Sequence, residues 1–255
     1  MRIISCNVNG IRAAARKGFF EWLSKQDADV VCLQEVRAQT GDIQDEVYWP
    51  SGYQVEYLPA VKKGYSGVAI YTKQKPDEII TTFGHALADE EGRYLCARYD
   101  DLFVGSLYLP SGTSGDERQT IKYDMMAAFE KYMDACQKSG GRYIFCGDWN
   151  IAHTQKDIKN WKANQKNSGF LPEERAWLDT LFGPKTWVDA FRVLNQEADQ
   201  YSWWSQRGRA RENNVGWRID YQIISSNLKN TLQGVAIDSK ERFSDHAPLV
   251  FDYHL

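Results

Sequence analysis

The fold is decided by the stretch Tyr143-Ile144-Phe145-Cys146-Gly147-Asp148-Trp149-Asn150, near the middle of the chain. Tyr143–Cys146 is short, apolar and rich in strand-favouring residues, so it predicts a buried β-strand. Gly147 ends the run, and two side chains that carry oxygen atoms, Asp148 and Asn150, follow at once. A buried strand ending in such side chains is typical of sites that proteins build on loops at strand ends.

Four more predicted strands have polar side chains at an end. Asn7 follows Arg2–Cys6, Glu35 follows Asp29–Gln34, Asp220 opens Ile219–Ile224, and Asp245-His246 precedes Leu249–Tyr253. Taken singly, each position is better explained as a turn or cap, because Asn and Asp favour both. Five strand ends with the same pattern favour one common site.

The order of elements indicates mixed sheets. Further strands are predicted over Gly67–Tyr71, Leu95–Arg98 and Leu102–Leu107, the last two forming a hairpin across Asp100-Asp101. Helical spacing predicts helices over Ala13–Gln26, Glu117–Gln137 and Pro172–Leu181, and a surface loop or irregular helix is expected over Lys156–Phe170. Helices separate only some strands, which favours mixed sheets over a doubly wound parallel sheet. Neither a repeat nor a linker divides the chain, so residues 1–255 are expected to form a single domain.

Composition limits the classes of protein. The 255 residues are 43% hydrophobic and 25% charged, as in ordinary globular proteins. No apolar run approaches the roughly 20 residues that span a bilayer, and the first ten residues do not resemble a signal peptide. The five cysteines are scattered and odd in number, so neither a disulfide framework nor a zinc site is indicated. We therefore expect a cytoplasmic protein without a membrane partner.

The formal net charge of −3 counts, by itself, against a nucleic-acid partner, because phosphate backbones attract Lys and Arg. A carboxylate-rich metal site would also make the total acidic, while one face of the molecule stays basic. Carboxylates such as Glu35 and Asp148 suit Mg²⁺, which proteins often hold with one or two carboxylates. Metal-assisted hydrolysis of a phosphodiester is one reaction that such a site can perform.

Seven motifs, in order and at this spacing, carry a resemblance that covers essentially the whole chain. They are Asn7–Arg12, Leu33-Gln34-Glu35, Tyr108–Gly112, Gly147–His153, Asn167–Phe170, Gly216–Tyr221 and Ser244–Pro248. With them the sequence resembles the exonuclease III-like abasic-site endonucleases of the deoxyribonuclease-I-like endonuclease/exonuclease/phosphatase superfamily. The resemblance implies an α/β fold, a four-layer α/β/β/α sandwich with two mixed β-sheets packed face to face.

The resemblance also implies an activity and a set of residue roles. The activity is hydrolysis of the phosphodiester 5′ to an abasic site in base excision repair, with 3′-5′ exonuclease or 3′-phosphodiesterase activity. The catalytic residues would be Tyr108, Asp148, Asn150, Asp220, His246 and Asn7. The ligands of Mg²⁺, which Mn²⁺ could replace, would be Glu35, Asp245, Asn7, Asp148 and Asn150. In these roles Asp148 orients or deprotonates the attacking water, and Asp220 holds His246.

The substrate would be double-stranded DNA with abasic sites or blocked 3′ ends, bound by a monomer. Basic and aromatic residues alternate over Trp203–Arg218, and lysines recur over Lys156–Lys166, as DNA-binding surfaces require. Core packing of the Trp203-Trp204 pair and a solvated lysine face explain the same residues without DNA. The residues expected to contact DNA are Arg118, Phe170, Trp217, Arg207, Arg209 and Lys166, with Phe170 and Trp217 lining a pocket for the extruded abasic sugar.

The chain departs from the animal branch of that family. Asn9 stands where animal members carry Asp, which would leave metal binding more dependent on Glu35. Ser111 and Ser114 replace an Asn and an Arg, which puts the phosphate contacts of those positions in doubt. The long basic extension is missing, so the chain resembles the bacterial members.

Two other functions fit part of the pattern. A phosphatase or lipid phosphodiesterase of the same superfamily would share the metal site, because the site alone does not define the substrate. A catalytically silent DNA-binding module would share the surface. Every catalytic position of the family is present in this sequence, which argues against the second alternative.

Overall fold

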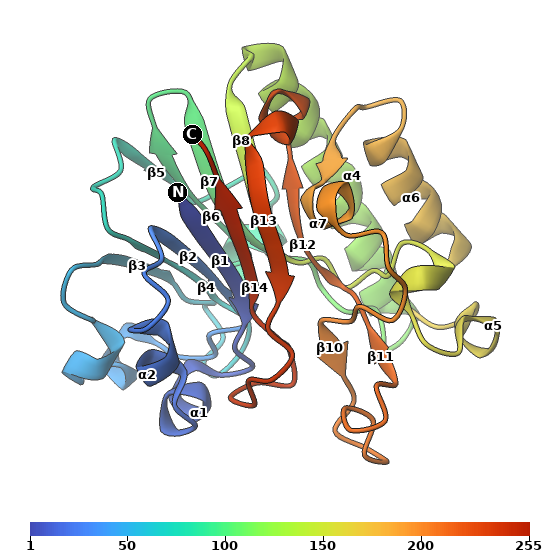
Figure 1. Cartoon of the computed structure of the whole chain (residues 1–255), viewed down its shortest axis with the longest axis horizontal. Coiled ribbons are helices and arrows are strands. Elements are labelled where there is room, and N and C mark those ends of the chain that lie inside the picture. The colour runs from blue at the N-terminus through green and yellow to red at the C-terminus, as the bar shows by residue number, and fades with distance from the viewer.

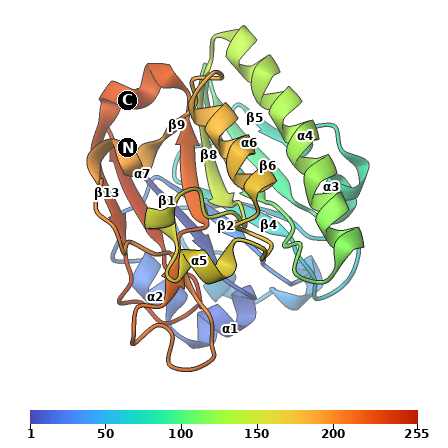
Figure 2. The same cartoon turned by 90° about the vertical axis from the view of Figure 1, so that its right-hand side faces the viewer.

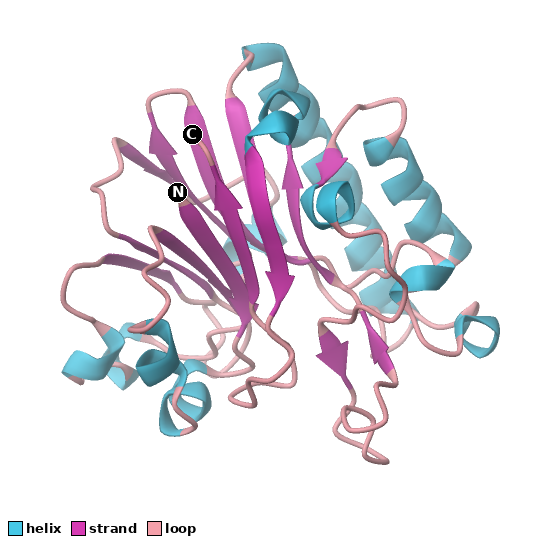
Figure 3. Ribbon diagram, in the orientation of Figure 1, coloured by secondary structure: helices cyan, strands magenta, loops and turns pink.

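The computed structural model describes all 255 residues and consists of two six-stranded sheets stacked face to face, with helices outside them (Figure 1, Figure 3). In order, the first sheet contains β13 (Leu232–Ile237), β14 (Leu249–Tyr253), β1 (Arg2–Asn7), β2 (Val30–Gln34), β4 (Val68–Thr72) and β3 (Gln54–Leu58). The second contains β5 (Glu78–Ile80), β6 (Tyr94–Tyr99), β7 (Leu102–Tyr108), β8 (Arg142–Asp148), β12 (Asp220–Ile224) and β9 (Val188–Asp189). A separate hairpin joins β10 (Trp203–Trp204) to β11 (Gly216–Trp217).

Both sheets are mixed. The pairs β1–β2 and β7–β8 are parallel, and the other neighbours run antiparallel. Successive side chains of a strand face opposite ways, so each central strand contributes to two cores. In β8, Ile144 and Cys146 join the core between the sheets, whereas Tyr143 and Phe145 face the outer helices. Burial on both faces explains why these strands are almost continuously apolar in sequence.

Helices cover the outer face of each sheet (Figure 2). On the first sheet, α1 (Ile11–Arg16) and α2 (Phe19–Leu23) pack over apolar side chains of β1, β2 and β4. On the second, α4 (Asp116–Ser139) and α6 (Pro172–Phe182) pack against β6, β8 and β12. The expected four-layer sandwich is therefore confirmed. The remaining helices are α3 (Ala86–Glu90), α5 (Trp161–Asn164) and α7 (Ala190–Leu194).

The sheets bring the predicted polar strand ends to one edge of the sandwich. Parallel pairing aligns the carboxyl ends of β1 with β2 and of β7 with β8. Antiparallel pairing places Asp220, at the start of β12, directly opposite Asp148, at the end of β8. The loop that carries Asp245 and His246 enters β14 beside the end of β1, because Leu249 pairs with Ser5.

Two expectations about local structure need correction. The helix predicted over Ala13–Gln26 is two short helices, because Gly18 adopts a left-handed φ of 92° that interrupts the turn. Strands β3, β5 and β13 were not predicted, since they lie toward the sheet edges with half-exposed residues and lack a continuous apolar run. The segment Lys156–Phe170 is mostly irregular and contains the four-residue helix α5, in agreement with the expected loop or irregular helix. None of the helices combines the length and apolar character that crossing a bilayer requires.

The contact between β7 and β8 gives a first prediction. A Cβ atom on Gly147 would lie 2.0 Å from the carbonyl oxygen of Leu107, which is backbone and cannot move aside. We expect Gly147→Ala to lower the free energy of unfolding by about 2 kcal/mol or more, measured by urea denaturation. Gly41→Ala is the control, because nothing lies within 4 Å of its Cβ position. Equal denaturation midpoints for the two variants would contradict this close packing.

Candidate active site

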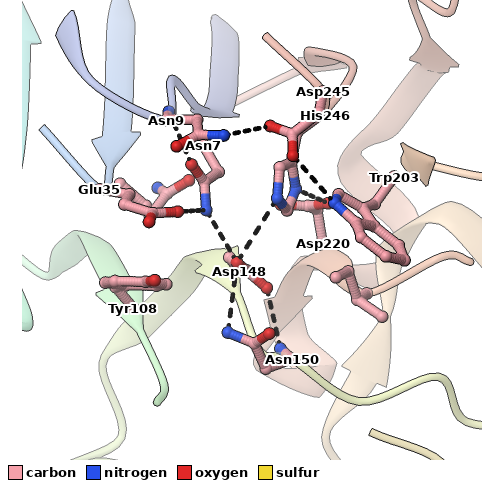
Figure 4. Close-up of polar contacts among 12 residues, drawn as sticks. Asn7, Asn9, Glu35, Tyr108, Asp148, Asn150, Trp203, Asp220, Asp245 and His246 are labelled. Carbon is pink, nitrogen blue, oxygen red and sulfur yellow. Dashed lines mark hydrogen bonds and ion pairs between the residues drawn. The ribbon is translucent and has the colours of Figure 1, made fainter. Parts of the chain in front are cut away.

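The polar strand ends open into a cavity of about 970 Å³ at the edge of the sandwich. Figure 4 shows the side chains that meet there, contributed by both sheets and by the β10–β11 hairpin. Asp148 lies at its centre with 2% of its surface exposed. Aromatic rings of Trp203 and Trp217 form part of its wall.

Asp148 is held by amide donors from both sheets. The Nδ2 atom of Asn7 donates to Asp148 Oδ2 at 2.8 Å, across the interface between the sheets. The backbone N–H of Asn150 donates to Asp148 Oδ1 at 2.9 Å, and its side chain reaches Oδ2 at 3.3 Å. Asn150 is itself anchored to the carbonyl of Leu109 at 2.8 Å. The carboxylate is therefore fixed in position by neutral donors, as a group that must orient water requires.

His246 lies between two carboxylates. Its Nδ1 atom is 2.8 Å from Asp220 Oδ2, and its Nε2 atom is 3.9 Å from Asp148 Oδ2. The hydroxyl of Ser202 donates to the same Asp220 oxygen at 2.6 Å. Asp220 Oδ1 is buried without any hydrogen-bond partner. Asp220 therefore orients the imidazole through one nitrogen and leaves the other directed toward Asp148.

Glu35 approaches the centre from β2, where it adopts a left-handed φ of 56°. Its Oε2 atom accepts a hydrogen bond from Asn7 Nδ2 at 2.9 Å, so Glu35 and Asp148 share one amide nitrogen. Its Oε1 atom is paired with the guanidinium of Arg37, which also lines the cavity. Positive φ is uncommon for a residue other than glycine, and it turns the Glu35 side chain toward the cavity.

Asp245 lies on the opposite wall. The side chain of Asn9 donates to its Oδ1 at 2.8 Å, and the indole N–H of Trp203 donates to its Oδ2 at 3.2 Å. The hydroxyl of Ser244 holds the carbonyl of Asn7 at 2.7 Å, which ties this loop to β1. Asn9, which stands where animal members of the resembled family carry Asp, thus contacts Asp245 instead of adding a charge.

Tyr108 ends β7 and lines the cavity beside Asp148. Its ring packs on the buried guanidinium of Arg93, whose Cζ atom is 4.7 Å from the ring centroid. Arg93 also donates to the Tyr108 carbonyl at 2.9 Å. Burial, followed by the negative charges of Glu35 and Asp148, raises the pKa of Tyr108 well above its ordinary value. Its hydroxyl therefore keeps its proton at neutral pH.

The shared burial also shifts the pKa values of Asp148 and His246. Desolvation, followed by repulsion from Asp220, raises the pKa of Asp148 to about 7, although His246 opposes this. Desolvation alone would lower the pKa of His246, but the carboxylates of Asp220, Asp148 and Asp245 outweigh it and raise the pKa to about 10. Both shifts favour the protonated form, because the buried carboxylates around His246 and Asp148 are poorly solvated and repel one another.

The donor set fits a divalent metal ion. Asp148, Asp220 and His246 offer ligand atoms within 4.8 Å of one another. Asp220 and the Nδ1 atom of His246 already bond each other, so we expect the metal at the Glu35–Asp148 side instead. The Glu35 and Asp148 oxygens lie within hydrogen-bond distance of one amide nitrogen, and hard oxygen donors suit Mg²⁺. A cation there would also replace Arg37 as the partner of Glu35.

The residues expected to contact DNA divide into two groups. Lys166, Arg207 and Trp217 line the cavity. Phe170 does not, since it is fully buried in a cluster with Ile158 and Ile219, and Trp217 packs against this cluster. Arg118 and Arg209 do not line the cavity either.

Arg118 and Arg209 each have an acidic partner. Arg118 donates to both carboxylate oxygens of Glu91, at 2.9 and 2.7 Å. Arg209 is exposed and forms an ion pair with Glu212. Any DNA contact by these residues would therefore compete with an ion pair that already exists.

Sequence reasoning missed several residues that hold the site. Arg218, expected to neutralise phosphate, is 1% exposed and bonds Asp157 and Asp189 beneath the cavity. Ser202 and Arg93 carried no signal in the sequence, because neither lies in a recognisable motif. Trp203 could have been found from its place in the aromatic-basic segment, but its bond to Asp245 could not.

A sequence profile of the Endonuclease/Exonuclease/phosphatase family matches residues 4–246, nearly the whole chain. The chain belongs to this family. It is a phosphodiesterase of the nuclease type, and metal dependence is typical of the family.

Two sequence relatives and one solved structure are similar to nearly the whole chain. The chain is 40% identical over 252 residues to a Bacillus subtilis (strain 168) protein named exodeoxyribonuclease, with 98% of both chains covered. It is 36% identical over 253 residues to the DNA-(apurinic or apyrimidinic site) endonuclease of Dictyostelium discoideum, covering 98% of this chain and 69% of that one. The structure of an AP endonuclease from Archaeoglobus fulgidus matches all of both chains, with a TM-score of 0.91 at 24% identity. At that identity the structural match supports the fold alone.

The raised pKa of Asp148 predicts a pH dependence of stability. An unfolded Asp ionises near pH 4, whereas the folded group ionises at about 7, so the folded state binds more protons between these values. Stability without metal is therefore lost as pH rises through this window. His246 acts with the same sign at higher pH, from about 6.5 to about 10.

We expect Asp148→Asn to remove this loss. From about pH 4.5 to about pH 7.5 in EDTA, the unfolding free energy of the wild type should fall relative to the variant by on the order of 2–4 kcal/mol. Urea denaturation at each pH measures the difference. Parallel stability profiles for the two proteins would show that Asp148 titrates as an ordinary carboxyl group.

Proposed function

We propose that this chain cleaves the DNA backbone 5′ to abasic sites, with Mg²⁺ as its ion and Mn²⁺ as a possible substitute. The observation that carries the proposal is Asp148, a buried carboxylate fixed by Asn7 and Asn150, with His246 Nε2 directed toward it at 3.9 Å. The names of the relatives, exodeoxyribonuclease and apurinic-site endonuclease, support DNA as the substrate.

Glu35 would be the main metal ligand, with Asp148 and the oxygen atoms of Asn7 and Asn150 nearby. When bound, the cation would neutralise negative charge on the phosphate oxygens. Asp245 is a further candidate for this role, and like Glu35 and Asp148 it accepts hydrogen bonds on both carboxylate oxygens. The chain's own residues carry the other steps.

Asp148 would accept a proton from the attacking water and orient it toward phosphorus. Its fixed position between the amides of Asn7 and Asn150 suits this role. His246, held by Asp220, would donate through Nε2 to a phosphate oxygen as negative charge develops there. Tyr108 would keep its proton and place its hydroxyl against the phosphate or the leaving oxygen.

The walls of the cavity would select the substrate. Trp203 and Trp217 stand edge to face, with ring centroids 6.1 Å apart, and both line the cavity. An abasic sugar extruded from the duplex would enter beside these rings. Lys166 and Arg207, on the cavity rim, would neutralise flanking phosphates. Phe170 would act only through its support of Trp217.

Other expectations stay predictions. Removal of blocked 3′ ends or of 3′ nucleotides would use the same site, with a strength set by how the strand end fits the cavity. A monomeric state and a cytoplasmic location are expected from the sequence. Inositol-phosphate or lipid phosphodiesterase activity is disfavoured, because the names of both sequence relatives refer to DNA.

A duplex with one tetrahydrofuran abasic analogue tests the function directly. We expect a single cut 5′ to the analogue in Mg²⁺, none in EDTA, and activity with Mn²⁺, each resolved on a denaturing gel. The control duplex carries an intact nucleotide at the same position. An uncut analogue strand, or turnover of inositol polyphosphate or sphingomyelin instead, would overturn the proposal.

Two substitutions separate the roles of the carboxylates. Asp148→Asn should lower kcat by about 10³-fold or more while the Kd for the abasic duplex changes little, because the amide cannot accept the proton. Glu35→Ala should lose activity that excess Mg²⁺ partly restores. Asp101→Asn, an exposed carboxyl in the β6–β7 turn, is the matched control and should behave as the wild type. Equal metal dependence of Glu35→Ala and wild type would remove Glu35 from the metal site.

A further inference from the structure

An ion pair is completely buried in the outer helical layer, away from the catalytic carboxylates. It joins Lys122 of α4 to Glu174 of α6, and both side chains have 0% of their surface exposed. Figure 2 shows these two helices side by side over the second sheet. Neither residue belongs to the motifs that identified the site from the sequence.

Both partners also bond the backbone of loops at the cavity. Lys122 Nζ donates to the carbonyl of Asn150 at 2.8 Å. Glu174 Oε2 accepts from the backbone N–H groups of Gly169 and Leu171, at 2.7 and 3.0 Å. Gln119, which lines the cavity, donates to Glu174 Oε1 at 3.1 Å. The pair therefore links the loop after β8 to the loop before α6.

The pairing of the two charges does not by itself explain this arrangement. Two charges that leave water incur a large desolvation cost, and well-packed apolar residues in their place are often equally stable or more so. Desolvation does lower the pKa of Lys122, and Glu174 only partly opposes it. The pair instead supplies what apolar residues cannot, namely directional bonds to three backbone groups of two loops.

Each of the two loops contacts a different part of the proposed site, one at Asp148 and the other at Trp217. The first contains Asn150, which holds Asp148. The second contains Gly169, where a Cβ atom would lie 3.0 Å from both the Asn150 carbonyl and the Trp217 ring. The Gly169 carbonyl accepts from the N–H of Ala152 at 2.8 Å, so the loops also bond each other. A small shift of either loop would move Asp148 relative to Trp217.

We propose that Lys122 and Glu174 are positioning residues. They hold the Asn150–Ala152 and Gly169–Leu171 loops together, so that Asp148 and the ring of Trp217 contact the same nucleotide. This inference rests on the proposed function and deepens it. Misplacement of a catalytic group by about 1 Å can reduce a rate by 10²-fold, so a positioning pair far from the chemistry can have a large effect.

The double variant Lys122→Met/Glu174→Leu tests the proposal, because it removes both charges and keeps the volume nearly constant. We expect kcat on the abasic duplex to fall about 10- to 100-fold. The midpoint of thermal unfolding should fall too, because the Asn150 carbonyl and the N–H groups of Gly169 and Leu171 lose their buried partners, so kcat is measured at a temperature at which the variant is folded. Hydrogen exchange followed by mass spectrometry should show faster exchange in peptides that cover Gly169–Leu171, with unchanged exchange in the central strands.

Two further variants complete the test. Arg98→Met/Glu78→Leu removes an exposed ion pair between β5 and β6 and should leave kcat and loop exchange unchanged. Glu174→Gln keeps one oxygen acceptor for the loop, so its losses of kcat and of protection should lie between wild type and the double variant. If the double variant does not fold, Glu174→Gln alone tests the positioning role.

The outcomes separate the two proposals. Wild-type kcat, or wild-type exchange of the Gly169–Leu171 loop, in both Glu174→Gln and a folded double variant would overturn the positioning role. Wild-type protein that leaves abasic DNA uncut would overturn the proposed function instead. The exchange measurement uses no substrate, so it reports on the loops in either case.

Discussion

The structure depends on one hydrogen-bonded nitrogen, Asn7 Nδ2, which donates to Glu35 in the first sheet and to Asp148 in the second. A carboxylate buried between two sheets must have fixed partners, because an unpaired buried charge carries a large free-energy cost. Asn7 is fully buried, so its amide cannot turn to water. The spacing of the two sheets is thereby linked to the separation of the two carboxylates on which the proposed chemistry relies.

The core between the sheets contains further polar bonds below this point. Gln34 donates to Ser106 of the opposite sheet at 2.9 Å, and Tyr253 donates to Gln222 of the opposite sheet at 2.7 Å. Apolar packing alone would tolerate small sliding of one sheet over the other, whereas paired polar groups in a dry core fix one register. The same principle recurs in the outer layer with Lys122 and Glu174. Directional bonds appear wherever two segments must keep a defined relative position.

The basic residues show a division that net charge could not reveal. Three basic residues are buried and bond groups next to the site: Arg218 bonds Asp189, Arg93 bonds the Tyr108 carbonyl and Lys122 bonds the Asn150 carbonyl. Lys166 and Arg207 remain on the cavity rim, where a phosphate could reach them. A protein with a net charge of −3 can therefore present a local cationic rim to DNA, while much of its other positive charge is neutralised internally.

The sequence by itself determined the central strands, the layer order through the family resemblance, and the polar residues at the strand ends. These are local properties, since strand periodicity and turn chemistry act over a few residues. Only the tertiary structure decided that Phe170 packs against Trp217, that Arg118 pairs with Glu91, and that Arg218 bonds Asp189. Long side chains choose their partners from whatever the folded chain brings within reach, and residues such as Lys122 and Glu174 are 52 positions apart in sequence. No pattern along the chain encodes such a choice.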